Sequence, residues 1–321
     1  MITTQLEGGG QHECIVQEAL RRGIDVKEAN DGNSIRRTLL IQGECQEELV
    51  QGIPQSWVNK LATLTCDRKQ DTKELFGKLA IQAPRSIRFQ RLNELNPDLF
   101  TKKREFICKP EIGTNGKGVS FDMNSWLALK DYLNEPGAPA GPYLLEEYIS
   151  GVDLRVQVIG GRMVAACIRH PAFVIGDGKS TLQDLIENRR EQIRRQNPAN
   201  SLTIDAQSAH LIKEAGYTMS SVVETDVRVS LKRVANMGQG AIAEDCTDLV
   251  DPRIELWIDQ LRTALDMPYF ALDILTDDVT RFESYFALEV NLRAEWMHHT
   301  FSEGRQHDLA SVVIQELFRN K

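Results

Sequence analysis

Strictly alternating polar and apolar residues mark one β-hairpin in the middle of this chain. Over 152–158 the alternation places three polar side chains on one face of a strand, namely Asp153, Arg155 and Gln157. Gly160 and Gly161 then predict a tight turn into a second strand at 163–168. Shorter apolar runs predict further strands at 24–26, 39–41, 106–109 and 119–121.

Apolar residues at helical spacing predict amphipathic helices between these strands. The expected helices lie at 11–22, 72–79, 125–133, 182–196 and 308–318, and another begins at Asp251 as N-cap with Pro252 in its first turn. The helix at 182–196 is expected to be capped by Ser180 or Thr181. A Pro/Gly-rich loop at 136–142 predicts a subdomain border.

Composition is that of an ordinary water-soluble protein, with 321 residues, 41% hydrophobic residues and a net charge of −8. No run approaches the roughly 18 apolar residues of a membrane span, and the N-terminus does not read as a signal peptide. A nucleic-acid partner is not expected, because phosphate backbones need a basic footprint. Four arginines of the helix at 182–196 are expected to form a solvated face: Arg189, Arg190, Arg194 and Arg195.

The six cysteines are scattered without a Cys-x-x-Cys pair. This spacing argues against a zinc site and favours reduced thiols in a cytoplasmic protein.

Two strand-like runs carry acids in an apolar context. In 285–291, Glu289 and Asn291 point to the same face of a strand, and the run 269–275 contains Asp273. Three hard oxygen donors on neighbouring strands suit Mg²⁺ with nucleotide phosphates. The alternative is that the acids form buried ion pairs, with Arg281 or Arg293 as partners.

Three further segments have both a chemical and a plain interpretation. The glycine-rich stretch 109–119 suits phosphate binding or is a simple turn. The acidic stretch 144–153 suits adenine and ribose or is an exposed turn. The stretch 232–241, with two cations followed by an amide, suits a transferring phosphoryl group or is a solvated strand end.

The order of these segments resembles the ATP-grasp superfamily, more closely its cyanophycin synthetase type and the ATP-grasp half of bifunctional glutathione synthetase. The matching phrases are Phe106-Ile107-Cys108-Lys109-Pro110, Gly116-Lys117-Gly118-Val119, Glu146-Glu147-Tyr148-Ile149-Ser150-Gly151, Asp153-Leu154-Arg155-Val156, Glu289-Val290-Asn291 and Met297-His298-His299. The resemblance covers nearly the whole chain. It implies an α+β class with the ATP-grasp fold, whose two α+β subdomains clasp ATP. Three parts are expected: a small pre-ATP-grasp αβ domain at 1–65, a lid subdomain at 66–148 and a large subdomain with the metal site at 149–321.

The resemblance also implies roles for individual residues. Lys69 and Lys109 would hold the α- and β-phosphates, under a loop that contains Gly113, Asn115, Gly116, Lys117 and Gly118. Glu146, with the backbone of Glu147, Tyr148 and Ile149, would bind adenine, and Asp153 the ribose. Asp273, Glu289 and Asn291 would ligate two Mg²⁺ ions, with Mn²⁺ as a substitute. Catalytic roles fall to Arg233 and Asn236 at the phosphoryl group and to Arg155 and Arg169 at the carboxylate substrate.

The implied reaction is ATP-dependent ligation of a carboxylate to an amine through an acyl phosphate. The implied partners are amino acids or a short peptide, with a homodimer as a common state of the superfamily. A nucleotide-binding protein without catalysis is the alternative. The segment 292–296 departs from the family pattern, and there Arg293 is expected either to bind a substrate carboxylate or to pair with Glu295.

Overall fold

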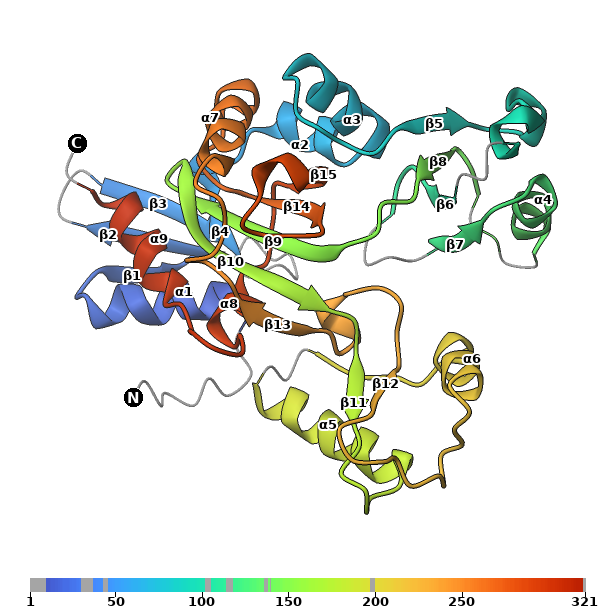
Figure 1. Ribbon diagram of the computed structural model, residues 1–321. Helices are drawn as coiled ribbons and strands as arrows, with labels where there is room; N and C mark the ends of the chain where they lie inside the picture. The colour runs from blue at the N-terminus through green and yellow to red at the C-terminus, as the bar shows by residue number, and fades with distance from the viewer. Residues whose placement is uncertain are drawn as a thin grey trace.

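Four β-sheets organise the part of the chain that the computed structural model describes, which is residues 10–29, 37–42, 46–101, 105–113, 118–135, 138, 140–196 and 200–319 (Figure 1). The largest sheet lies at the centre. A second sheet lies beside the N-terminal helix. A third forms a lobe with its own helix at the upper right of Figure 1, and the fourth belongs to a lobe at the bottom of that view.

The central sheet has the strand order β13-β10-β9-β14-β15, and every neighbouring pair is antiparallel. Its strands are β9 (Val152–Ile159), β10 (Arg162–His170), β13 (Ile242–Asp245), β14 (Phe270–Thr276) and β15 (Phe286–Asn291). The predicted hairpin is confirmed as β9 and β10. Helix α7 (Ile254–Leu265) buries its apolar stripe in a core shared with Val156, Val158 and Leu272 of this sheet.

The N-terminal part is a small sheet covered by one helix. Helix α1 (Gln11–Arg21) is followed by β1 (Asp25–Glu28), β2 (Thr38–Gln42), β3 (Gln46–Gln51) and β4 (Ile53–Pro54). Helix α9 (Leu309–Leu317) packs against α1, so the two ends of the described chain share one core. That core also holds Trp296 and Met297 of the short helix region α8 (Met297–Thr300).

The third sheet has the order β5-β8-β6-β7 and its own core. It consists of β5 (Ser86–Phe89), β6 (Phe106–Pro110), β7 (Ser120–Met123) and β8 (Tyr143–Glu147), and it packs with α4 (Trp126–Asn134). Helices α2 (Lys60–Cys66) and α3 (Lys69–Lys78) instead contact β15, and Phe76 of α3 lies in the core of the central sheet. The division at 65 and 148 stays a prediction, because α3 links the third sheet to the central one.

The fourth sheet lies in a segment inserted between β10 and β13. Strands β11 (Phe173–Ile175) and β12 (Arg228–Ser230) pair with each other, and helices α5 (Leu182–Gln196) and α6 (Ala206–Glu214) pack on them (Figure 1). Thr181 caps α5, since its Oγ1 accepts from the Asp184 N–H at 3.2 Å. We call this segment the insertion subdomain.

Several sequence expectations needed correction. Helix α7 begins at Ile254 rather than at Pro252, because the Asp251 side chain accepts from the Arg253 N–H and forms a turn before the helix. The apolar pattern also missed strands β3, β5 and β8 and helix α6. The stretch at 144–147 is a strand with Glu146 only 1% exposed, so the interpretation as an exposed acidic turn was wrong.

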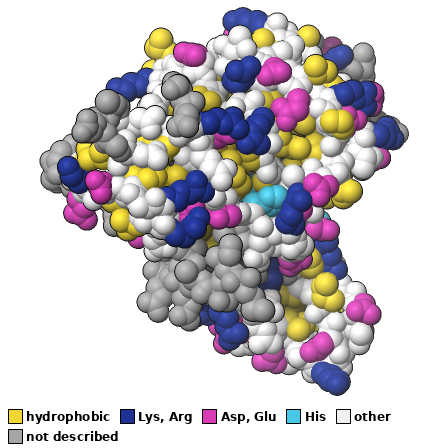
Figure 2. All heavy atoms as spheres, turned by 90° about the vertical axis from the view of Figure 1, so that its left-hand side faces the viewer, with side chains coloured by type: hydrophobic (Ala, Val, Ile, Leu, Met, Phe, Trp, Pro, Cys, Tyr) yellow, Lys and Arg dark blue, Asp and Glu magenta, His cyan; other side chains and the backbone are white. Residues whose placement is uncertain are grey.

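Charged side chains of both signs are distributed over the surface that Figure 2 shows. Figure 2 shows Lys and Arg interspersed with Asp and Glu over one face. Within the described residues, no helix combines the length and apolarity that crossing a bilayer requires.

Substitution of Gly151, between β8 and β9, by alanine is expected to destabilise the protein by about 1–3 kcal/mol. An added Cβ would lie 2.5 Å from the backbone oxygen of Thr276, and backbone cannot move aside as a side chain can. The measurement is the free energy of unfolding in urea. Gly77→Ala is the matched control: it lies in helix α3 with no atom within 4 Å of the new Cβ, and it should stabilise by about 0.5–1 kcal/mol. Equal stability of the two variants would contradict the packing described here.

Candidate nucleotide and metal site

Asp273, Glu289 and Asn291 converge on one face of the central sheet. Asp273 of β14 pairs directly with Glu289 of β15 in the strand register. The amide Nδ2 of Asn291 donates to Asp273 Oδ2 at 3.0 Å and to Glu289 Oε1 at 3.2 Å. The prediction that Glu289 and Asn291 share a face is therefore confirmed.

The donor set of these three residues fits Mg²⁺. Two carboxylates and one amide are hard oxygen donors, and Mg²⁺ prefers such ligands together with phosphate oxygens. The Asn291 amide nitrogen lies between the two carboxylates, where a cation would be attracted. Rotation of the amide by half a turn would place its Oδ1 there, as a ligand atom for the cation. The structure thus brings together every predicted metal ligand.

Two arginines surround Asp273. Arg155 Nη1 donates to Asp273 Oδ1 at 2.6 Å, while Arg169 Nη2 lies 3.2 Å from Asp273 Oδ2 and 2.6 Å from Asp153 Oδ1. The predicted ion pairs with Arg281 or Arg293 were therefore wrong in their partners: Asp273 pairs with Arg155 of the adjacent strand β9 and with Arg169 of β10, which is the next strand beyond β9.

Burial and the neighbouring arginines shift the pKa values of Asp153 and Asp273 in opposite directions. Burial raises the pKa of Asp153 to about 6, although Arg169 opposes this shift. Burial also acts on Asp273, but Arg155 and Arg169 outweigh it and lower the pKa of Asp273 to about 2. Asp273 is therefore ionised at neutral pH, which its predicted role as a metal ligand requires.

A buried cluster of two lysines and one glutamate lies between the third sheet and helix α3. Lys109 Nζ donates to Glu146 Oε1 at 2.7 Å, and Lys73 Nζ lies 3.0 Å from Glu146 Oε2. Lys73 was missed in the sequence. The signal that could have found it is its spacing, since it lies one helical turn after Lys69 and therefore on the same face of α3.

Lys69 lies in the same electrostatic environment. Its Nζ donates to the Gly113 carbonyl at 2.7 Å. Burial lowers the pKa of Lys69, while the nearby charge of Glu289 opposes this shift. The predicted phosphate-binding lysines and the predicted metal ligands thus belong to one neighbourhood. Of the predicted loop, Gly113 and Gly118 are described, whereas Asn115, Gly116 and Lys117 lie outside the described residues.

The backbone after β8 is partly committed to the third sheet. The Glu147 N–H donates to the Arg85 carbonyl and the Tyr148 N–H to the Glu105 carbonyl, both at 2.9 Å. These two N–H groups therefore cannot also donate to adenine. The predicted adenine contact narrows to the Ile149 N–H and to the carbonyls of this segment.

Arg233 and Asn236 lie on a segment between the insertion subdomain and β13. Asn236 caps the short helix η4 (Met237–Gln239), since its Oδ1 accepts from the Gly238 N–H at 2.8 Å. Arg233 is exposed, and its neighbour Lys232 is buried and bound to Asp205 at 2.5 Å. The interpretation as a solvated strand end was therefore wrong for Lys232, while the roles of Arg233 and Asn236 stay predictions.

Alternate residues of the unusual segment 292–296 are buried in the protein core. Leu292, Ala294 and Trp296 are buried, and the Tyr269 hydroxyl donates to the Ala294 carbonyl at 2.5 Å. Arg293 and Glu295, both of them described, form no ion pair with each other, so that predicted pair was wrong.

Two adjacent buried histidines follow this segment. The rings of His298 and His299 lie 4.4 Å apart, and burial lowers the pKa of each well below its usual value, so both are neutral. Together with Cys167 of β10 they present ligand-type atoms within 4.8 Å of one another. Cysteine spacing alone does not exclude such a group, because its three residues come from two separate elements of the fold.

The free energy of unfolding is expected to rise with pH between about 8 and 10 because of Lys73. Burial lowers the pKa of Lys73 to about 8, whereas the lysine of an unfolded chain titrates near 10.5. Between these values the unfolded chain binds more protons, so raising the pH favours the folded state by up to about 1.4 kcal/mol per pH unit. Urea denaturation at pH 7.5 and 9.5 measures this difference. Lys73→Met should lack this part of the slope, and identical slopes in both proteins would contradict the assignment.

A comparison with solved structures defines the class of fold. A crystal structure of bifunctional glutathione synthetase from Pasteurella multocida matches with a TM-score of 0.72 and 20% sequence identity, covering 97% of this chain and 44% of that chain. The chain therefore has the α+β ATP-grasp fold that its sequence predicted.

The sequence is similar to two kinds of longer biosynthetic protein. Cyanophycin synthetase of Trichormus variabilis is 28% identical over 98% of this chain and 35% of its own length. The glutathione biosynthesis bifunctional protein GshAB of Streptococcus thermophilus is 22% identical over 95% of this chain and 42% of its own. No family model matches. The chain is thus similar in sequence to both relatives, and it spans less than half the length of either.

Proposed function

We propose that this chain is an ATP-dependent carboxylate–amine ligase acting on amino acids or a short peptide. The observation that supports this most strongly is the convergence of Asp273, Glu289 and Asn291, with the lysines at Glu146 in the same neighbourhood. Such an arrangement can bind the phosphates of ATP and the reacting carboxylate side by side. The similarity to a cyanophycin synthetase and to a glutathione biosynthesis protein supports the same class.

The proposed reaction has two steps. A carboxylate oxygen attacks the γ-phosphorus, which breaks the bond to ADP and forms an acyl phosphate. An amine nitrogen then attacks the carbonyl carbon, loses a proton and displaces phosphate, which leaves an amide bond. Positioning and charge neutralisation contribute most of such catalysis, so no nucleophilic side chain is required.

The chain's own residues have distinct tasks in this proposal. Lys69 and Lys109 bind phosphate oxygens, and Asp153 binds the ribose after its Arg169 partner turns toward substrate. Arg155 keeps Asp273 ionised and faces the carboxylate substrate. Mg²⁺ held by Asp273, Glu289 and Asn291 would neutralise charge on the phosphate oxygens.

A nucleotide-binding protein without ligation is the second candidate. It is favoured by the hydrogen bond from Arg155 to Asp273, which commits one oxygen of a predicted metal ligand to a fixed partner.

An assay of ADP release separates the two functions. Purified protein is incubated with ATP, Mg²⁺ and pairs drawn from amino acids and dipeptides, and products are identified by mass spectrometry. A ligase releases ADP and phosphate in equal amounts only when both substrates are present, together with a condensed product. Binding of ATP without ADP release for any pair would support the silent alternative.

A further inference from the structure

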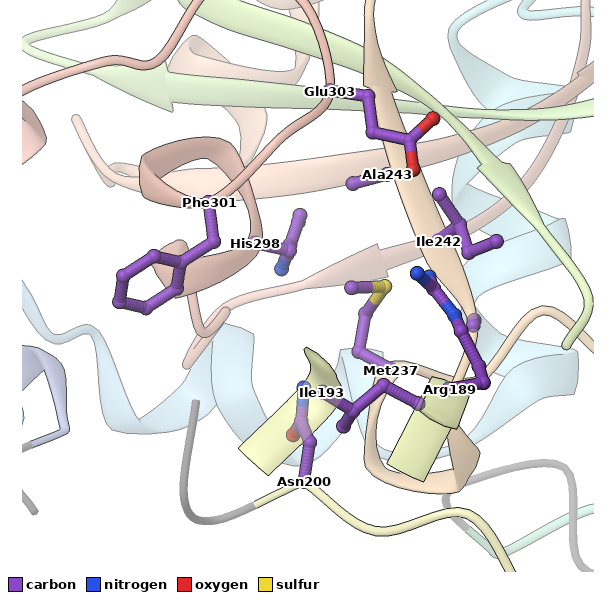
Figure 3. Close-up of a pocket in the computed structure, with 10 residues that line it drawn as sticks. Arg189, Ile193, Asn200, Met237, Ile242, Ala243, His298, Phe301 and Glu303 are labelled. Carbon is purple, nitrogen blue, oxygen red and sulfur yellow. The ribbon is translucent and has the colours of Figure 1, made fainter. Parts of the chain in front are cut away.

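A pocket lies between the insertion subdomain and the edge of the central sheet. It is lined by Arg189 and Ile193 of α5, by Met237 of η4 and by Ile242 and Ala243 of β13, and His298 and Phe301 close another side (Figure 3). None of these residues belongs to the predicted nucleotide or metal site.

Arg189 differs from Arg194 and Arg195 of its helix, whereas Arg190 is half-buried too and donates to the Leu202 carbonyl at 2.8 Å. Arg194 and Arg195 are exposed and pair with Glu187 and Glu191, as a solvated face predicts. Arg189 is half-buried, its Nη1 donates only to Gln192 among the described residues, and its buried Nε has no partner there. In Figure 3 its guanidinium extends into the pocket. A buried donor without an acceptor is costly, so this site suits an anionic ligand.

A carboxylate of opposite charge lies on the sheet side of the pocket. Glu303 is fixed by its backbone, since its N–H donates to the Ala243 carbonyl at 2.8 Å and its carbonyl accepts from the Asp245 N–H at 2.9 Å. Its charge acts on Arg189, although the two side chains form no direct ion pair. One cation and one anion across an apolar space match the carboxylate and ammonium groups of a zwitterionic amino acid.

The turn at Gly240, next to the pocket residue Ala241, is tightly packed. Gly240 follows η4 with φ +90°, and a Cβ there would lie 3.0 Å from Leu202 and 3.2 Å from Ile193. The insertion subdomain thus contacts this turn without spare room, which holds Arg189 in a fixed position relative to β13.

The sheet order separates this pocket from the predicted metal ligands. Strand β13, which lines the pocket, lies three positions from β14, which carries Asp273. Strands are spaced by about 4.8 Å, so these two strands are about 14 Å apart. A carboxylate on Arg189 therefore lies too far from Asp273 to be the one that is phosphorylated.

We propose that Arg189 binds an unreactive carboxylate at an amino-acid end of the substrate, and that Glu303 faces the ammonium group of the same zwitterionic end. This assignment rests on the proposed ligase function and names its substrate class. Ile193, Met237, Ile242 and Phe301 provide the apolar walls beside this end. The reacting group lies at the other end of that substrate, which must be longer than a single amino acid to reach Asp273 across about 14 Å.

Steady-state kinetics with matched substrates test the assignment. The panel contains free amino acids and dipeptides, and each is paired with its C-terminal carboxamide. Arg189→Gln should raise the KM of the acid substrate on the order of tenfold to a hundredfold and leave the KM of ATP unchanged. The carboxamide should be a poor substrate for both proteins. Arg195→Gln, on the same helix, is the matched control and should behave as wild type. A wild-type KM in Arg189→Gln, or equal use of acid and carboxamide by the wild type, overturns the assignment.

Binding measurements separate this assignment from the ligase function. If no pair supports ADP release, the ligase proposal fails, and ligand-observed NMR with the same panel then tests the pocket alone. Binding of a free amino acid to the wild type that is lost in Arg189→Gln supports the pocket. Absence of binding by any panel compound to the wild type, or equal binding by both proteins, overturns it.

Discussion

Replacing Asp273 by asparagine is expected to lower the rate of ADP formation by a factor of about 10²–10³. The variant loses the charge that the two arginines and the proposed Mg²⁺ share, so charge on the transferring phosphoryl group is no longer balanced. The measurement is steady-state ADP release with a substrate pair that the wild type uses.

Two further variants distinguish lost chemistry from lost folding. Asp273→Asn leaves Arg155 and Arg169 with less compensation, which also reduces stability. Glu289→Gln removes a predicted metal ligand whose side chain accepts only from Asn291 among the contacts described above, so it should lose activity and keep its fold. Asp277→Asn, an exposed acid just after β14, should keep both. Full turnover in Asp273→Asn or Glu289→Gln would contradict the metal assignment.

Replacing Glu146 by glutamine is expected to destabilise the protein by about 3–5 kcal/mol. The carboxylate is 1% exposed and is the shared partner of Lys73 and Lys109, so its loss leaves two buried ammonium groups without a balancing charge. Urea denaturation at pH 7 measures the change.

The neighbouring residue provides the control for Glu146. Glu147→Gln changes the next, more exposed carboxylate of β8 and should alter stability by less than about 0.5 kcal/mol. A Glu146→Gln protein as stable as Glu147→Gln would show that the lysines do not depend on Glu146. Such a result would return Glu146 to a role in adenine binding alone.

The parts of the site that sequence predicted follow from strand periodicity. Glu289 and Asn291 are two residues apart on a strand, and this spacing alone puts them on one face. The same rule placed Asp153 and Arg155 together on β9. Asp273 could be predicted as a site residue because it is an acid within an otherwise apolar strand.

The parts that sequence missed depend on contacts between distant segments. Arg155 and Arg169 became the partners of Asp273 through the strand order β10-β9-β14, which no local pattern contains. Nothing in the local sequence distinguishes Lys73 from the other polar residues of its helix. Its burial results from the packing of α3 against β15. Glu146 reads as part of an acidic turn, because its burial arises only when β8 pairs with β5 and β6 on both sides.

Arg189 illustrates the same limit at the surface. Helical spacing grouped it with Arg190, Arg194 and Arg195, and nothing in that pattern separates one from the others. Only the approach of β13 and η4 to one side of α5 gives it a different environment.

A crystal structure with a non-hydrolysable ATP analogue and Mn²⁺ is the most direct test of the proposed nucleotide and metal site. We expect phosphates on Lys69 and Lys109, adenine beside the segment 146–149, and anomalous density for Mn²⁺ between Asp273, Glu289 and Asn291. Nucleotide bound elsewhere, or no metal density at these three residues in crystals that contain the analogue, would contradict it.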